Sequence, residues 1–199
     1  MQLPPRPEAD INTRTVEDAC ELTTRATTLV HASSMWLSNV ATLGRESHAM
    51  SESFALAAAP ALDNIDKDNP CVPPSALPKF VELVALGRTV TRAISQNSAT
   101  LSNLLGKTSV SYLPQAVCDA NTLITLDTKF RNIFARLSLL EANLGQKGFA
   151  AIHNGVTSLR NQHDQNVSIA CETARGVEKI LANTICILRV LEFLVSDVR

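Results

Sequence analysis

FAAIHNGVTSLRNQHDQNVSIACETARGVEKILANTICILRVLEFLVSDV, the stretch from Phe149 to Val198, decides the fold of this chain of 199 residues. A set of mostly apolar residues recurs along it at alternating steps of three and four, which places them as one stripe on one side of an α-helix. Such a seven-residue repeat keeps one side of a long helix against a partner helix, so the stretch predicts a single long helix. The stripe consists of Phe149, Ile152, Val156, Leu159, His163, Asn166, Ala170, Thr173, Val177, Ile180, Thr184, Ile187, Leu191, Leu194 and Val198.

Three earlier segments carry the same spacing. They run from Leu22 to Ala57, from Phe80 to Leu104, and from a start near Pro114 through Leu123 to Leu144. No alternating strand pattern appears, so the predicted fold class is all-α. We expect four long amphipathic helices that form an elongated helical bundle or coiled coil. The short segment Gly145-Gln-Lys-Gly148 predicts a turn, so helices three and four should form an antiparallel hairpin.

Helix-breaking residues and capping patterns divide the chain. Thr15 with Asp18 three positions later resembles a capping box and predicts a helix start. A cluster of prolines and Asx residues from Pro60 onward predicts a linker, and Gly106 ends the second helix. The predicted organisation is a disordered proline-containing N-terminus over 1–14, a long helix over 15–59, a linker over 60–78 and a three-helix coiled-coil or bundle region over 79–199.

Composition excludes several classes of function. The net charge is −1 and basic residues are scattered singly, which disfavours nucleic-acid binding. The most apolar stretch, Ile180 to Val195, contains charged residues and is shorter than a bilayer span, so we expect no integral membrane segment. The N-terminus lacks the apolar run of a secretory signal, and the odd number of cysteines, 5, has no closely spaced pair. These features predict free thiols and a cytoplasmic location.

The sequence contains no spacing that predicts catalysis. Its four histidines are far apart, and no cysteine pair, HExxH motif or glycine-rich phosphate loop accompanies them. We therefore expect no enzyme activity, no catalytic residue, no cofactor and no metal site.

Two stripe positions, His163 and Asn166, carry polar side chains where Leu or Ile would be more stabilising. Either they face the seam and specify register and partner, or the helix changes its buried face there. In the second case Val167, Ala170, Ala174, Val177, Leu181, Leu188 and Val195 form an alternative stripe, and the two polar residues point to solvent. We favour this second interpretation, because a stutter keeps the buried face apolar.

The end of the last helix is apolar on more than one face, which exceeds what one antiparallel neighbour can bury. The pattern fits both an intramolecular core and assembly with other helical subunits, either identical or different. The residues predicted to bind a partner are Leu137, Leu140, Leu144, His163, Asn166, Ile180, Ile187, Leu191 and Leu194.

The run QHDQNVSIACE from Gln162 to Glu172, together with the upstream segment LSLLEA from Leu137, resembles the C-terminal part of the small dynactin shoulder subunit, the dynactin subunit 3 family. The resemblance implies a helical, non-catalytic subunit that packs with other helical proteins and is associated with the cytoskeleton. The function predicted from pattern and resemblance is a scaffold or adaptor subunit of a cytoplasmic complex that acts by helix–helix recognition. The alternatives are a BAR-like membrane-surface module, which the scattered cations disfavour, and a viral structural protein.

Overall fold

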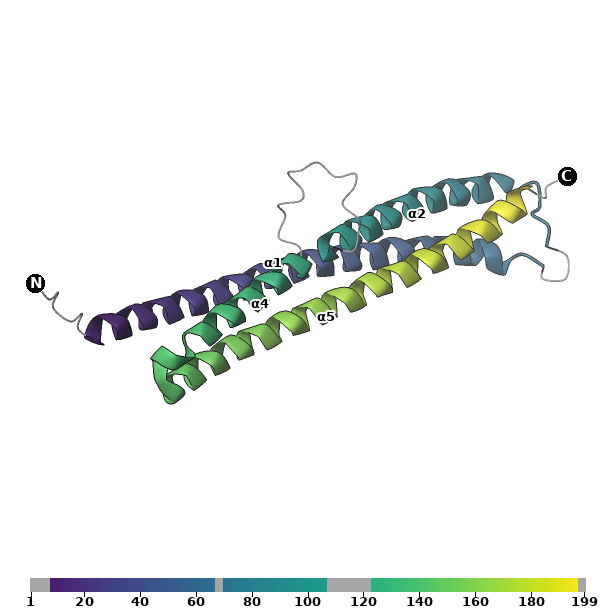
Figure 1. Ribbon diagram of the computed structural model, residues 1–199. Coiled ribbons are helices and arrows are strands. Elements are labelled where there is room, and N and C mark those ends of the chain that lie inside the picture. Colours follow the sequence, from purple (N-terminus) through teal and green to yellow (C-terminus); the bar gives the residue numbers. More distant parts are fainter. Residues whose placement is uncertain (1–7, 67–69, 107–122, 197–199) are drawn as a thin grey trace, which may run out of the picture. The chain divides into compact units, whose positions relative to one another are not determined.

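The structure, a computed structural model, describes residues 8–66, 70–106 and 123–196, with side chains for 15–66, 70–106 and 126–196. The regular elements of the described residues are all helices, and these residues contain no strand (Figure 1). The predicted all-α fold class is confirmed. The helix start predicted near Pro114 lies outside the described residues, as do Cys118 and Val198. The helices are α1 (Glu8–Asp63), α2 (Leu77–Leu105), α4 (Leu123–Leu139) and α5 (Glu141–Ser196).

The first helix is longer at both ends than its sequence signals indicated. It begins at Glu8, so Thr15 lies inside the helix as a buried residue and the capping-box interpretation is wrong. Nothing between Glu8 and Thr15 breaks a helix, and Pro7, a residue type that is favoured at helix starts, directly precedes Glu8. Residues 8–14, which the sequence assigned to a disordered N-terminus, are therefore helical.

At its other end α1 continues through Pro60 to Asp63, although the sequence predicted an end before that proline. Pro60 lies in the last turn, where Ala58 is buried and Leu62 is half-buried. The side-chain amide of Asn64 donates a hydrogen bond of 2.7 Å to the carbonyl oxygen of Pro60. This bond satisfies the carbonyl oxygen of Pro60 near the helix end, and apolar packing offsets the loss of the backbone hydrogen bond that proline cannot donate. The non-helical part of the predicted linker is correspondingly shorter, and it contains the buried side chain of Val72.

The predicted hairpin of the last two helices is confirmed. Gly145 has φ 67° and ψ 160°, a non-helical conformation that favours glycine, and it separates the short turn after α4 from the long run of α5. The chain reverses direction there, and α4 and α5 run antiparallel (Figure 1). Gly106, with φ 74°, likewise follows the last residue of α2.

The chain divides into two compact units, and α1 and α5 contribute to both. The first unit comprises Met1–Ser38 with Leu105–Ile169. Its core joins one side of α1 to α4 and to the first part of α5, and the stripes predicted for these helices supply it. The buried residues are Leu22, Ala26, Val30, Phe130, Ile133, Leu137 and Val156.

The second unit comprises Asn39–Leu104 with Ala170–Arg199, and it packs the later part of α1 with α2 and the end of α5. Gly87 of α2 allows a close approach here: a Cβ at this position would lie 2.7 Å from the ring of Phe54 and 2.9 Å from a methyl group of Leu188. The largest fully buried side chains of this unit are Val40, Phe54, Leu83, Ile94, Leu101 and Leu191.

Candidate functional site

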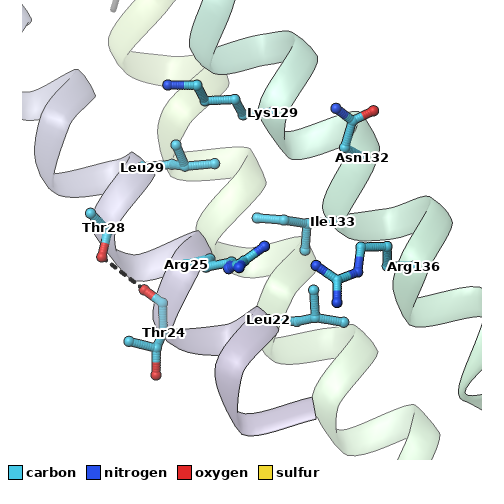
Figure 2. Close-up of a pocket in the computed structure, with 9 residues that line it drawn as sticks. All are labelled: Leu22, Thr24, Arg25, Thr28, Leu29, Lys129, Asn132, Ile133 and Arg136. Carbon is cyan, nitrogen blue, oxygen red and sulfur yellow. Dashed lines mark hydrogen bonds between the residues drawn. The ribbon is translucent and has the colours of Figure 1, made fainter. Parts of the chain in front are cut away.

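A groove of about 340 Å³ lies between α1 and α4 in the first unit (Figure 2). Its apolar lining comes from Leu22 and Leu29 of α1 and Ile133 of α4. Leu22 and Ile133 are buried core residues, so the groove opens directly onto the core of this unit. A groove with this construction offers apolar contact to a ligand without any rearrangement of the helices.

Cationic side chains surround the apolar lining. Arg25 comes from α1, and Lys129 and Arg136 come from α4. Figure 2 shows the guanidinium ends of Arg25 and Arg136 directed toward one another. Among the residues that the structure describes, the lining contains no acidic side chain; its other members are Thr24, Thr28 and Asn132. The sequence pattern did not indicate this site: Lys129 and Arg136 share one face of α4, but only the packing of α1 on α4 brings Arg25 to them.

Polar residues of the α5 stripe form a second feature of the first unit. His163 is fully buried, with 0% of its surface exposed, and Asn166 is 9% exposed. The amide nitrogen of Asn166 donates hydrogen bonds to the hydroxyl oxygens of Ser33 at 2.9 Å and of Ser34 at 3.2 Å, both on α1. Asn166 is therefore a paired polar group inside a helix seam.

The favoured sequence interpretation, in which α5 turns His163 and Asn166 to solvent, is wrong. Both residues lie on the buried face of α5. Beyond Ala170, which the two stripes share, Ala174 and Leu188 of the alternative stripe are buried, whereas Thr173 and Ile187 of the original stripe are half-buried. The physical reason lies on α1, whose own stripe carries Ser33 opposite Asn166. The hydroxyl oxygen of Ser33 accepts a hydrogen bond from the Asn166 amide, which offsets the cost of burying that polar group. Periodicity within one helix contains no information about that partner.

His163 lies in a less complementary environment. Its ring packs against Phe130 of α4, with centroids 5.0 Å apart and an interplanar angle of 32°. Neither ring nitrogen has a hydrogen-bond partner among the described residues. Burial is the main cause that lowers the pKa of His163, and the nearby charge of Arg160 lowers it further. The carboxylates of Asp164 and Asp127 oppose the shift without reversing it.

Charged groups form a network beside this ring. The Arg160 guanidinium binds the carboxylate of Asp127 on α4 and, at 2.8 Å, the carboxylate of Asp164 on its own helix. It also lies over the ring of Phe130, 5.6 Å from the centroid. The second oxygen of Asp127 pairs with Arg131 at 3.0 Å. The network therefore ties α4 to α5 by charge as well as by apolar packing.

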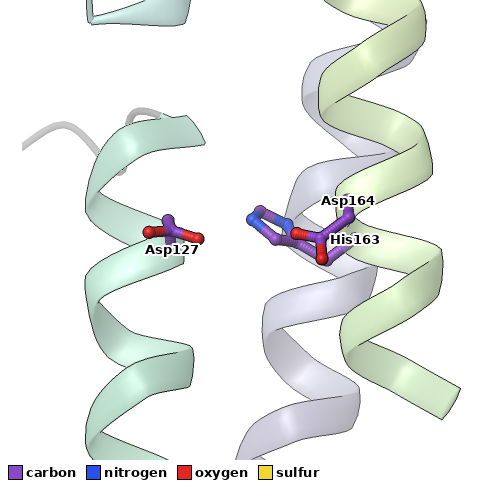
Figure 3. Close-up of side chains that lie close together, drawn as sticks. All are labelled: Asp127, His163 and Asp164. Carbon is purple, nitrogen blue, oxygen red and sulfur yellow. The ribbon is translucent and has the colours of Figure 1, made fainter. Parts of the chain in front are cut away.

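Asp127, His163 and Asp164 contain the ligand types of a divalent cation site, and one ligand atom from each lies within 4.8 Å of the others (Figure 3). The guanidinium of Arg160 already occupies the space a cation would need, because it binds both carboxylates. A metal ion would have to displace this arginine and overcome its repulsion. We therefore interpret the cluster as a structural ion-pair network on the helix seam.

The structure places the other predicted partner-binding residues within the chain's own packing. Leu137, Leu191 and Leu194 are buried, and the remaining four, Leu140, Leu144, Ile180 and Ile187, are half-buried. Their proposed contact with another protein stays a prediction. Larger exposed apolar side chains lie nearby on α5: Val190 is 49% exposed and Phe193 is 57% exposed.

These two residues line an apolar cavity of about 330 Å³ in the second unit, together with Leu62, Ile65, Asp66, Pro70 and Leu194. The four cysteines of the described residues, Cys20, Cys71, Cys171 and Cys186, form no disulfide. None of the described helices is both long enough and apolar enough to cross a membrane. Comparison of the chain with protein-family models, with curated proteins and with solved structures found no match.

Proposed function

We propose that the protein is a non-enzymatic scaffold subunit that binds other helical proteins through exposed apolar surface on its helices. The observation that carries the proposal is the end of α5, where Val190 and Phe193 remain about half exposed beside an apolar cavity. Aromatic and aliphatic side chains next to a cavity are typical anchors of a protein interface, because a partner removes them from water together.

The packing within each unit supports the same proposal. Long helices that bury one stripe keep the opposite face available, so a further helix can pack on the surface without unfolding the unit. The resemblance of residues 162–172 to the small dynactin shoulder subunit suggests a setting in the dynein–dynactin machinery of the cytoskeleton, and that resemblance is the support for this finer proposal.

Copurification from native extract combined with light scattering tests the proposal. The wild-type chain should copurify with a helical protein at fixed stoichiometry or form a defined homo-oligomer. Phe193→Asp should weaken that association by about tenfold or more, because a charge would enter a desolvated contact. Leu56→Asp is the matched control, since Leu56 is also exposed in the second unit, at 69%, and lies outside the cavity. A stable monomer that binds no protein would disprove the proposal.

A further inference from the structure

The groove between α1 and α4 combines apolar surface with a concentration of positive charge. Apolar side chains contribute to its lining, yet the charged side chains among its described lining residues are all cations, namely Arg25, Lys129 and Arg136. Like charges that converge on a small apolar surface repel one another, and the repulsion is removed when an anion binds between them. The groove therefore selects for a ligand that carries negative charge and apolar groups side by side.

The ion pairs of the two arginines leave this selection in place. Arg136 forms no ion pair with any residue that the structure describes, and Arg25 pairs with Glu21 one turn earlier on the exposed surface of α1. A solvent-exposed pair at this spacing contributes only a few tenths of a kcal/mol, so Arg25 can exchange this partner for another carboxylate at small cost. The hydroxyl groups of Thr24 and Thr28 donate to carbonyl oxygens of α1 and need no external acceptor.

The dimensions of the groove restrict the ligand. Its volume of about 340 Å³ is at the lower end of the range for small-molecule sites, so it accommodates a few side chains rather than a large ligand. The walls are two helices, and a third helix can pack along such a groove with side chains spaced three and four residues apart. Cations on both walls can then bind acidic residues on either side of the apolar contact.

We infer that this groove binds an acidic amphipathic helix of a partner protein. Apolar side chains of that helix contact Leu22, Leu29 and Ile133, and its carboxylates bind the guanidinium groups of Arg25 and Arg136 in the bidentate geometry that arginine favours. The inference rests on the proposed function, because it names the chemistry of one partner of the scaffold.

A peptide library tests the inference directly. The probes are fluorescent 18-residue helical peptides with two Leu residues four positions apart on one face, and with flanking Glu residues placed in every register. A matched library replaces each Glu by Lys. The Glu peptides should bind the full-length protein in at least one register, and affinity should fall as salt is raised. The Lys peptides should bind at least about tenfold more weakly.

Charge reversal locates the binding. Arg25→Glu with Arg136→Glu should weaken the best Glu peptide by about tenfold or more, and should improve binding of the corresponding Lys peptide. The matched control is Arg92→Glu with Arg175→Glu, two exposed cations of the second unit, which changes the net charge equally and should leave affinity within about twofold. Circular dichroism verifies that both double variants retain their helix content.

Three outcomes would overturn the inference: no Glu peptide binds in any register, the Lys peptides bind equally well, or the charge-reversed protein binds the Glu peptide like the wild type. Vesicles with phosphatidylserine serve as a separate arm. Binding to them that is lost in the Arg25 and Arg136 variant, without peptide binding, would assign the groove to lipid headgroups instead. If a protein copurifies equally with the wild type and with this variant, the proposed scaffold function stands and the groove inference fails.

Discussion

Replacing His163 by Leu should stabilise the first unit. The wild-type ring is fully buried and neither of its nitrogens has a hydrogen-bond partner among the described residues. An unpaired buried polar group costs about 1–3 kcal/mol of folding free energy, and Leu removes this cost because its volume is similar and it has no polar atom. Leu also loses the ring contact with Phe130, which contributes about 0.5–1.5 kcal/mol. We expect a net gain of about 1 kcal/mol.

Urea unfolding at pH 8 measures this gain, since His163 is neutral in both states at that pH. The single tryptophan, Trp36, is half-buried in the same unit and reports its unfolding by fluorescence. A gain of about 1 kcal/mol corresponds to a rise in Tm of about 2–4 °C for a chain of this size. The control is His153→Leu, because the half-buried ring of His153 also contacts aromatic rings, those of Phe134 and Phe149, but its nitrogens are not buried without partners.

A loss of stability in His163→Leu at pH 8 would refute this reasoning. It would show that the imidazole has a favourable polar partner in solution, such as an ordered water, whose interaction outweighs the burial cost. An equal gain in His153→Leu would refute it differently, since the effect would then come from general apolarity rather than from the unpaired nitrogens.

Acidification should lower the folding stability through His163. Its pKa in the folded state lies below the usual value of 6.5, so the unfolded state binds more protons at pH values between the two. Stability should therefore be constant above about pH 7.5 and fall as the pH is lowered through 6.5, by at most about 1.4 kcal/mol per pH unit, and urea titrations of His163→Leu should lack this component. Gly87→Ala should destabilise the second unit by about 1 kcal/mol net, because the added methyl group overlaps a buried ring. Gly176→Ala places its methyl group in open space and should stabilise the unit by about 0.5–1 kcal/mol. Thermal melts measure both changes, and a higher Tm for Gly87→Ala with a lower Tm for Gly176→Ala would contradict this packing. Limited proteolysis should cut first within the 60–78 segment. Val72→Ser should accelerate that cleavage, because the buried side chain of Val72 anchors the segment. An unchanged cleavage rate would show that Val72 does not hold the segment.

The fold was predictable from the sequence because each helix buries one continuous stripe. The residues predicted for the stripe of α1, such as Leu22, Val40 and Phe54, are among the buried ones. Helix ends were less predictable, since the end of α1 depends on the packing of Ala58 and Leu62, which the local sequence does not encode. Proline at position 60 argued for a break that tertiary packing overrides.

The site features were predictable only in part. His163 and Asn166 were identifiable as unusual stripe residues, but their orientation depends on Ser33, far away in the sequence. Asp127 and the cations of the groove carried no signal, because a charged residue on an amphipathic helix is ordinarily a solvated one. Only the packing of α1, α4 and α5 brings these side chains together.

The two polar residues of the α5 seam have different consequences for register. If α5 slid by one turn along α1, Asn166 would lose Ser33 and Ser34, and its buried amide would cost about 1–3 kcal/mol. His163 imposes no such penalty, because its nitrogens are already unpaired among the described residues. Asn166 therefore specifies the alignment of the two helices, as a buried asparagine does in coiled coils.

The second unit contains a similar polar contact, since the hydroxyl groups of Ser51 and Thr184 lie 2.8 Å apart between α1 and α5. Register in each unit thus depends on a paired polar contact within a largely apolar seam.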